Sequence, residues 1–303
     1  MKKPVLMAGV VSVFALRFVL GAGALLAQQQ QQKQQPEQPS EAAKVAQSVK
    51  WQNGPSSATL GTVADVRIPT GYMFAGAADT IKLMDVMGNI PSKQELGLLA
   101  PQTFDWFVIY EFEGVGYVKD DEKNSLDADA LLKSIRQGTE RGNKIRKARG
   151  LPAMRNIQWV TKPHYDEKTH NLEWSISGED DTGDQFVNHN TRLLGRKGIM
   201  VVTLVADPKD MVEVLPSFRT SLDDFSFKTG NTYAEFREGD KLAGYGLTAL
   251  VAGGAAAVAV KTGLFKYLGK FLIFIFAGLA AFFKKLWAKI SGFFRSEDRQ
   301  TPP

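Results

Sequence analysis

The chain has 303 residues, 44% of them hydrophobic, and no cysteine, which excludes disulfides, thiolate metal sites and a cysteine nucleophile. Its net charge of +5 is concentrated at the two ends. Residues 1–17 carry +3 and residues 261–303 carry +6, which leaves −4 for residues 18–260. A mildly acidic central part argues against nucleic acid as a partner.

Residues 1–27 have the pattern of a secretory signal peptide. Two lysines precede an uncharged apolar run, and Ala22-Gly23-Ala24 fits the small residues of a cleavage site. Arg17 interrupts the apolar region, so an uncleaved N-terminal anchor is the alternative. The glutamine-rich stretch that follows has nothing to bury and predicts a disordered linker over residues 28–50.

Residues 51–240 are predicted to form an exported α+β domain. Alternation of apolar and polar residues predicts strands, several of them paired as hairpins. The predicted strands lie at 104–114, 156–162, 171–178, 185–194 and 198–206, and the predicted helices at 77–87, at 128–149 and from Asp207-Pro208 onward. The run Ile199–Val205 is apolar on both faces, which predicts a central strand covered on both sides. Together these elements indicate an antiparallel sheet with packed helices, a sandwich.

Residues 241–290 predict a membrane anchor. Leu242–Val260 carries no charge, and as a helix it is about 28 Å long, close to the thickness of a bilayer core. A second segment at residues 268–286 has lysines near its ends and a shorter apolar core. A transmembrane helix and a helical hairpin with two crossings both fit this pattern.

Two small residues in the first segment, Gly253 and Gly254, suit close contact between membrane helices. Residues 291–303 form a polar tail. A signal peptide, a linker and a C-terminal anchor predict an exported domain attached to a membrane. In a bacterium this is the inner membrane, and the main domain faces the periplasm or the cell exterior. The predicted partners are the lipid bilayer and another envelope or membrane protein.

The acidic stretch "GYVKDDEKNSLDADAL", residues 116–131, raises the question of a metal or acid–base site. The spacing of its acids does not fit a calcium loop of the EF-hand kind. Asp127 instead has the place of an N-cap, with leucines in the staple positions around it. The cap leaves Asp120, Asp121 and Glu122 unexplained, and a solvated turn and an interaction surface are the alternatives for these three.

Two further groups of polar residues are candidate sites. His164, Asp166 and His170 flank a predicted turn, where they are either metal ligands or exposed side chains. Three other polar residues recur with period 2 on the strand 185–194, where they form either a binding surface or the wet side of a sheet. These are Asn188, Asn190 and Arg192.

Five stretches, in this order, resemble the uncharacterised bacterial membrane-anchored family called domain of unknown function 2167. They are "IPTGYMFAGAADT" (68–80), "GYVKDDE" (116–122), "PHYDEKTHNLEWS" (163–175), "NHNTRLLGRKG" (188–198) and "DKLAGYGLTALVAGGAAA" (240–257). The resemblance implies an exported bacterial domain with a C-terminal membrane anchor, and it implies no activity, cofactor or catalytic residue. The inferred order of elements also resembles, more loosely, the small sandwich folds of the Mog1/PsbP kind.

The sequence lacks the motifs of serine hydrolases, P-loop nucleotide binding and dinucleotide binding. No cofactor is predicted. We therefore expect an interaction or structural module of the bacterial envelope. The alternative is an envelope enzyme or metal-binding protein that uses one of the two polar groups described above.

Overall fold

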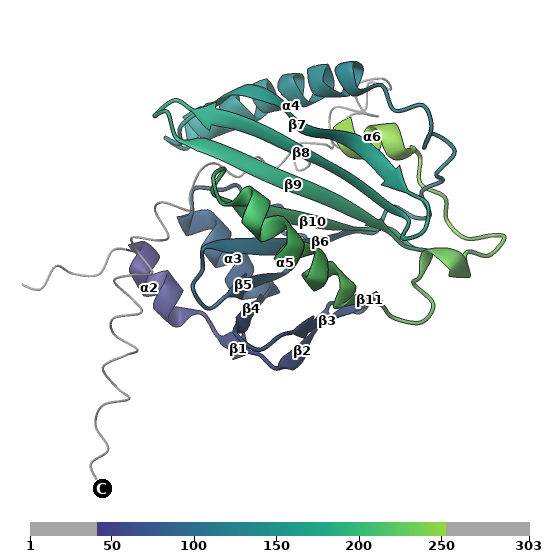
Figure 1. Ribbon diagram of the computed structural model, residues 1–303, viewed down its shortest axis with the longest axis horizontal. Helices are drawn as coiled ribbons and strands as arrows, with labels where there is room; N and C mark the ends of the chain where they lie inside the picture. Colours follow the sequence, from purple (N-terminus) through teal and green to yellow (C-terminus); the bar gives the residue numbers. More distant parts are fainter. Residues whose placement is uncertain (1–40, 253–303) are drawn as a thin grey trace, which may run out of the picture. The chain divides into compact units, whose positions relative to one another are not determined.

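An eight-stranded antiparallel sheet lies at the centre of the fold in the computed structural model, which describes residues 41–252 (Figure 1). Every neighbouring pair of strands in this sheet is antiparallel. In spatial order the strands are β1 (Trp51–Asn53), β4 (Tyr72–Gly76), β5 (Glu95–Pro101), β6 (Trp106–Glu113), β10 (Ile199–Ala206), β9 (Gln185–Leu194), β8 (Asn171–Asp180) and β7 (Met154–Asp166).

One face of this sheet is covered by a small sheet and a helix. The small sheet contains β2 (Ser56–Leu60), β3 (Ala64–Ile68) and β11 (Phe225–Phe227), and the helix is α5 (Met211–Asp223). Alternate residues of β10, namely Met200, Val202 and Leu204, pack into the core between these layers. Phe218 of α5 is fully buried in the same core.

The opposite face is covered by helices in two groups. The helices α2 (Glu41–Ser48) and α3 (Ala77–Val86) cover one half, and α4 (Ala128–Ala148) and α6 (Leu247–Ala252) cover the other. Figure 1 shows α4 lying along β7. Ile199 and Val201 of β10 pack toward the second group, and Val205 packs toward the first. The prediction of a central strand buried on both faces is therefore confirmed for β10.

The predicted N-cap of the long helix is also confirmed. Oδ1 of Asp127 accepts hydrogen bonds from the backbone N–H groups of Asp129 and Ala130, at 3.1 and 3.0 Å. Leu131 and Ile135 on the inner face of α4 are buried. The cap satisfies two of the N–H groups that a helix start leaves without partners, and burial of the apolar stripe holds α4 on the sheet.

Helix α5 differs from its prediction, because it begins at Met211 and not at Asp207-Pro208. The Asp207 carboxylate accepts from the backbone N–H of Lys209 at 3.1 Å, and Asp210 N–H donates to the Asp207 carbonyl at 3.0 Å. Asp207 therefore caps a tight turn that precedes the helix. Helix α2 is a second difference, because it occupies part of the segment predicted as a disordered linker.

Several predictions lie outside the described residues. These are the signal peptide at 1–27, the first part of the linker, Gly253 and Gly254, the segment at 268–286 and the tail at 291–303. Of the segment Leu242–Val260, the structure describes residues 242–252, which include α6. Within residues 41–252, no helix combines the length and the apolar character that crossing a bilayer requires.

Candidate binding site

The acidic loop at residues 116–122 is joined to the segment at 241–248. Tyr117 pairs with Leu242 in a parallel β-bridge, and the Tyr117 backbone bonds to Lys241 and Ala243 at 2.8 Å each. Gly116 has a φ of +100°, and a Cβ there would lie 2.5 Å from the Lys241 carbonyl oxygen. Only glycine permits this approach without a shift of the backbone.

Glu122 adds a hydrogen bond between the same two segments, 116–122 and 241–248. Its Oε2 accepts from the backbone N–H of Thr248 at 2.7 Å, at the start of α6. A Cβ at Gly246 would lie 2.7 Å from the Glu122 carboxyl carbon, so the absence of a side chain at residue 246 makes room for this bond. The turn predicted for the three acids is present, but Glu122 has a specific role in it. Asp121 is exposed.

Asp120 belongs to a second contact, which connects the acidic loop with the β7–β8 hairpin. The Tyr165 hydroxyl lies 3.1 Å from Oδ2 of Asp120 and 3.0 Å from Nδ1 of His170. Burial raises the pKa of Tyr165 above its usual value, and the neighbouring Asp120 raises it further. The phenol therefore keeps its proton at neutral pH and stands between an acid and an imidazole.

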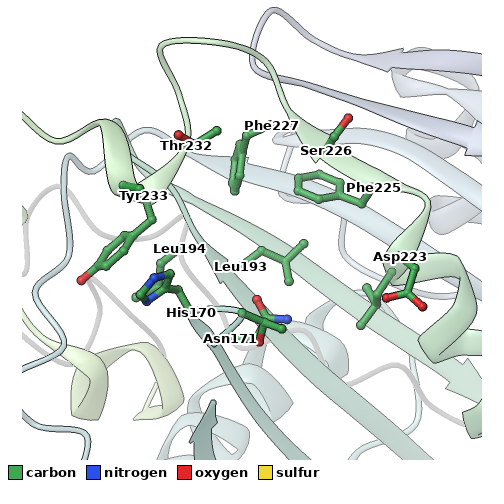
Figure 2. Close-up of a pocket in the computed structure, with 13 residues that line it drawn as sticks. His170, Asn171, Leu193, Leu194, Asp223, Phe225, Ser226, Phe227, Thr232 and Tyr233 are labelled. Atoms are coloured by element: carbon green, nitrogen blue, oxygen red, sulfur yellow. The ribbon is translucent and has the colours of Figure 1, made fainter. Parts of the chain in front are cut away.

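His170 is one of the residues that line a pocket of about 420 Å³, which is shown in Figure 2. Leu193 and Leu194 of β9, both buried, line its base, Leu193 from one face of the sheet and Leu194 from the other. In Figure 2, Tyr233 and His170 lie at one side, Asp223 at the other, and the side chains of β11 above the base. The thirteen lining residues are Thr169, His170, Asn171, Leu193, Leu194, Leu222, Asp223, Phe225, Ser226, Phe227, Thr232, Tyr233 and Ala234.

Aromatic stacking fixes the wall on the side of His170. The Tyr233 ring, in the 3-10 helix η1 (Tyr233–Glu235), lies 4.4 Å from the ring of Tyr117 and 4.5 Å from that of His170, centroid to centroid. The Tyr233 hydroxyl donates to the Val118 carbonyl at 3.1 Å. Burial raises the pKa of Tyr233, so its hydroxyl remains a donor. This wall is preorganised.

A charged pair holds the segment that carries η1. Nε and Nη2 of Arg196 donate to the two carboxylate oxygens of Asp240 at 2.7 and 2.8 Å. The two hydrogen bonds from Arg196 lower the pKa of Asp240 to about 2, so the pair stays ionised at any physiological pH. Thr232 and Glu235 form a capping box at η1. Two of the quoted motif stretches, 163–175 and 188–198, line the pocket, and two others, 116–122 and 240–257, supply Tyr117 and Asp240, which support its wall.

The predicted metal ligands have separate partners. Nε2 of His164 lies 3.8 Å from Oε2 of Glu173, whereas His170 contacts Tyr165. The Asp166 carboxylate accepts from the backbone N–H of Lys168 at 2.8 Å, within the turn. Residues 41–252 contain no group of three or more His, Asp or Glu side chains arranged to hold a metal ion.

The polar stripe of β9 is not on the wet side of the sheet, so that prediction is wrong. Asn188 and Asn190 are 0% and 6% exposed, because the helical layer covers this face. The guanidinium of Arg192 lies 4.6 Å from the centroid of the Trp174 ring and is attracted by Glu111 and Glu113. These side chains form a polar row beneath the helices.

Sequence reasoning missed two buried carboxyls in this row. Glu95 and Glu111 are 4% and 3% exposed and face each other across β5 and β6. The Ser92 hydroxyl donates to Glu111 at 2.6 Å, and the Ser92 N–H donates to Glu95 at 2.7 Å. Burial raises the pKa of Glu111 to about 7. An acid inside the run "WFVIYEFE" was the available signal.

A Ser–His–Glu group on the opposite face was also missed. Oγ of Ser175 lies 2.8 Å from Nδ1 of His189, and Nε2 of His189 lies 3.6 Å from Oε2 of Glu173. The His189 contact lowers the pKa of Glu173. The residue types are those of a hydrolase triad, but Ser175 is 2% exposed in the middle of β8. A hydroxyl buried in this way is not accessible to a substrate, so we assign the group to the core, where Ser175 and His189 are hydrogen-bonded to each other.

These features define an α+β domain with one eight-stranded antiparallel sheet, packed helices and an aromatic pocket at the ends of strands β8 and β9. The chain belongs to the family described as a protein of unknown function (DUF2167), whose profile matches residues 52–286. The family resemblance predicted from the five sequence stretches is thereby confirmed. A search of curated proteins found no match.

Among solved structures, the domain is similar to the solution structure of cyanobacterial PsbP (CyanoP) from Synechocystis sp. PCC 6803. The two chains are 10% identical, with a TM-score of 0.33. The similarity covers 59% of this chain and 92% of the other.

Proposed function

We propose that this protein is an envelope interaction module, attached to the bacterial inner membrane, and that its pocket contacts a partner. The observation that carries the proposal is the pocket of about 420 Å³. This volume lies within the range of specific binding sites, and its lining mixes apolar surface with a few polar groups, as such sites do. The other polar groups described above, Asn188 with Asn190 and Ser175 with His189, are buried and therefore closed to a partner.

The location is proposed from sequence. A signal peptide at 1–27 and the apolar segment at 268–286 support export followed by membrane attachment. The first part of the predicted span 242–260 instead belongs to the domain, because Leu242 pairs with Tyr117 and Leu247, Leu250 and Val251 of α6 are buried in its core. The contacts between residues 116–122 and 241–248 hold the start of α6 on the domain, because Glu122 accepts a hydrogen bond from Thr248 in its first turn. The main domain then faces the periplasm or the cell exterior.

Site-specific photocrosslinking in intact cells tests the proposal. A photoreactive residue at Ser226, which is exposed and lines the pocket, should give a discrete adduct in the full chain. The matched control is Val212 on α5, which is 81% exposed and does not line the pocket. Equal adduct patterns from both positions, or none from Ser226, would contradict the proposal.

A second contact is proposed within the membrane, through Gly253 and Gly254. Replacing both glycines with leucine is expected to abolish association with a membrane partner, because the larger side chains keep helices apart. Co-purification of the full chain with and without the replacements measures this, and unchanged association would remove the contact from the proposal.

A further inference from the structure

We infer that the pocket binds a protonated amine or a guanidinium carried on an apolar stem, an inference that rests on the proposed binding function of the pocket. Its shape, charge and hydrogen-bonding groups each point to this ligand. The chemistry is that of a lysine or arginine side chain, or of a small organic amine.

The formal charge of the pocket favours a cation. Asp223 is the one carboxylate among the lining residues, and neither lysine nor arginine lines the pocket. The neighbouring Asp224 pairs with Arg67, which also donates its backbone N–H to the Asp224 carbonyl at 3.0 Å. Asp223 is exposed, and within residues 41–252 its carboxylate has neither a hydrogen bond nor an ion pair. An anionic ligand would be repelled by this uncompensated charge.

The hydrogen-bond chain at the opposite side supplies a second acceptor. The Tyr165 hydroxyl donates its single proton to Oδ2 of Asp120, at 3.1 Å. The Tyr165 oxygen then accepts from Nδ1–H of His170. A neutral imidazole with its proton on Nδ1 has a lone pair on Nε2, which is therefore available to accept a hydrogen bond from an N–H donor.

The walls suit an apolar stem with a cationic head. Leu193 and Leu222 provide aliphatic surface. The rings of Phe225 and Phe227 are perpendicular to each other, with centroids 4.9 Å apart, and Tyr233 lies on the side of His170. Aromatic faces attract ammonium and guanidinium groups through their quadrupoles. Asp223 and the aromatic rings offer a cationic head more than a neutral ligand would gain, and His170 offers a separate acceptor at the other side of the pocket.

Titration calorimetry on the full chain in detergent tests the inference with defined probes. N-acetyl-lysine methylamide and N-acetyl-arginine methylamide should bind at least about tenfold more tightly than the neutral N-acetyl-norleucine methylamide. Asp223→Asn should weaken the cationic probes about tenfold, whereas the exposed acid Glu140 on α4, changed to Gln, should leave them unchanged. Equal binding of norleucine and lysine probes, or no binding by any, would overturn the inference.

The positioning role of Tyr165 has its own readout. The chain has three histidines, so ¹⁵N spectra of labelled imidazoles can assign each tautomer. His170 should carry its proton on Nδ1, and Tyr165→Phe should shift it toward the Nε2–H form and weaken the lysine probe several-fold. An Nε2–H tautomer in the unmodified chain would overturn the assigned acceptor.

A third experiment distinguishes the two sources of the amine, a small organic molecule and a side chain of a partner polypeptide. Comparable or tighter binding of 1,5-diaminopentane supports a small organic amine, and preference for the capped amino acids supports a side chain of a partner polypeptide. The proposed function is tested separately by the Ser226 crosslink. If the adduct forms while the cationic probes neither bind nor compete with it, the ligand assignment fails and the binding function stands.

Discussion

Two polar regions of this domain contain similar side chains and differ in what surrounds them. The row beneath the helices, with Asn188, Asn190, Arg192 and Glu111, is covered, and its members face one another. The pocket at the ends of β8 and β9 leaves Asp223 exposed to solvent. A buried polar group needs a partner inside the protein, whereas a solvent-exposed polar group in a pocket is available to bind a ligand. The difference assigns the row to stability and the pocket to binding.

The largest expected effect comes from removing the cation of the row. Arg192→Met leaves Glu111 and Glu113 without their buried counter-charge and should lower the free energy of unfolding by about 4 kcal/mol. Urea denaturation of the full chain measures this change. A loss below about 1 kcal/mol would show that the row is solvated and would remove its contrast with the pocket.

The next effect depends on pH. Because burial raises the pKa of Glu111 from 4.5 to about 7, the folded state holds this proton more tightly than the unfolded state. Stability is therefore greatest below pH 4.5 with respect to this group, falls as the pH rises toward 7, and is level above that. The stability lost between pH 4.5 and pH 7 is about 3 kcal/mol, because each pKa unit of difference between the folded and unfolded states corresponds to about 1.4 kcal/mol.

Glu111→Gln removes this titration and should leave stability less dependent on pH between 5 and 8. The free energy of unfolding of the variant, relative to that of the unmodified chain, should increase as the pH rises, because the amide is neutral throughout. Denaturation midpoints at pH 5 and pH 8 decide the matter. Parallel pH profiles for the two chains would show that Glu111 titrates normally.

A smaller effect is expected at the start of α4. Asp127→Ala removes the acceptor of two backbone N–H groups and should cost about 1 kcal/mol. Asp127→Asn keeps an acceptor and serves as the matched control, with a loss of a few tenths of a kcal/mol. Equal losses for alanine and asparagine would indicate that the charge of Asp127, and not its capping bonds, stabilises the helix.

The smallest effect on stability is expected in the pocket. Asp223→Asn should change the free energy of unfolding by less than about 0.5 kcal/mol, because the carboxylate is exposed and has no partner within residues 41–252. A loss above about 1 kcal/mol would show that Asp223 supports the fold, and the two polar regions would then not differ in kind.

The elements that sequence predicted well have strong local signals. Strand β10 is apolar throughout, and α4 combines an N-cap with a regular buried stripe. The start of α5 was misplaced because Asp207-Pro208 suits both a helix start and the turn that forms there. The strands of the small sheet have five residues or fewer, which is too short for alternation to identify them.

The site was less predictable than the fold. His170, Leu193, Phe225 and Tyr233 lie far apart in sequence and meet only through strand pairing and the docking of η1. The polar residues at 188, 190 and 192 alternate as they would on a solvent-exposed face. Only the helices that cover them make this face buried. Alternation identifies a shared face, but it does not reveal what covers that face.

The most direct test of the contrast measures stability and lysine-probe affinity for Arg192→Met and Asp223→Asn side by side in the full chain. The account predicts that Arg192→Met lowers the free energy of unfolding and leaves affinity unchanged under folded conditions. Asp223→Asn should lower affinity about tenfold and leave stability unchanged. An Asp223→Asn variant that keeps full affinity would contradict the assignment of binding to the pocket.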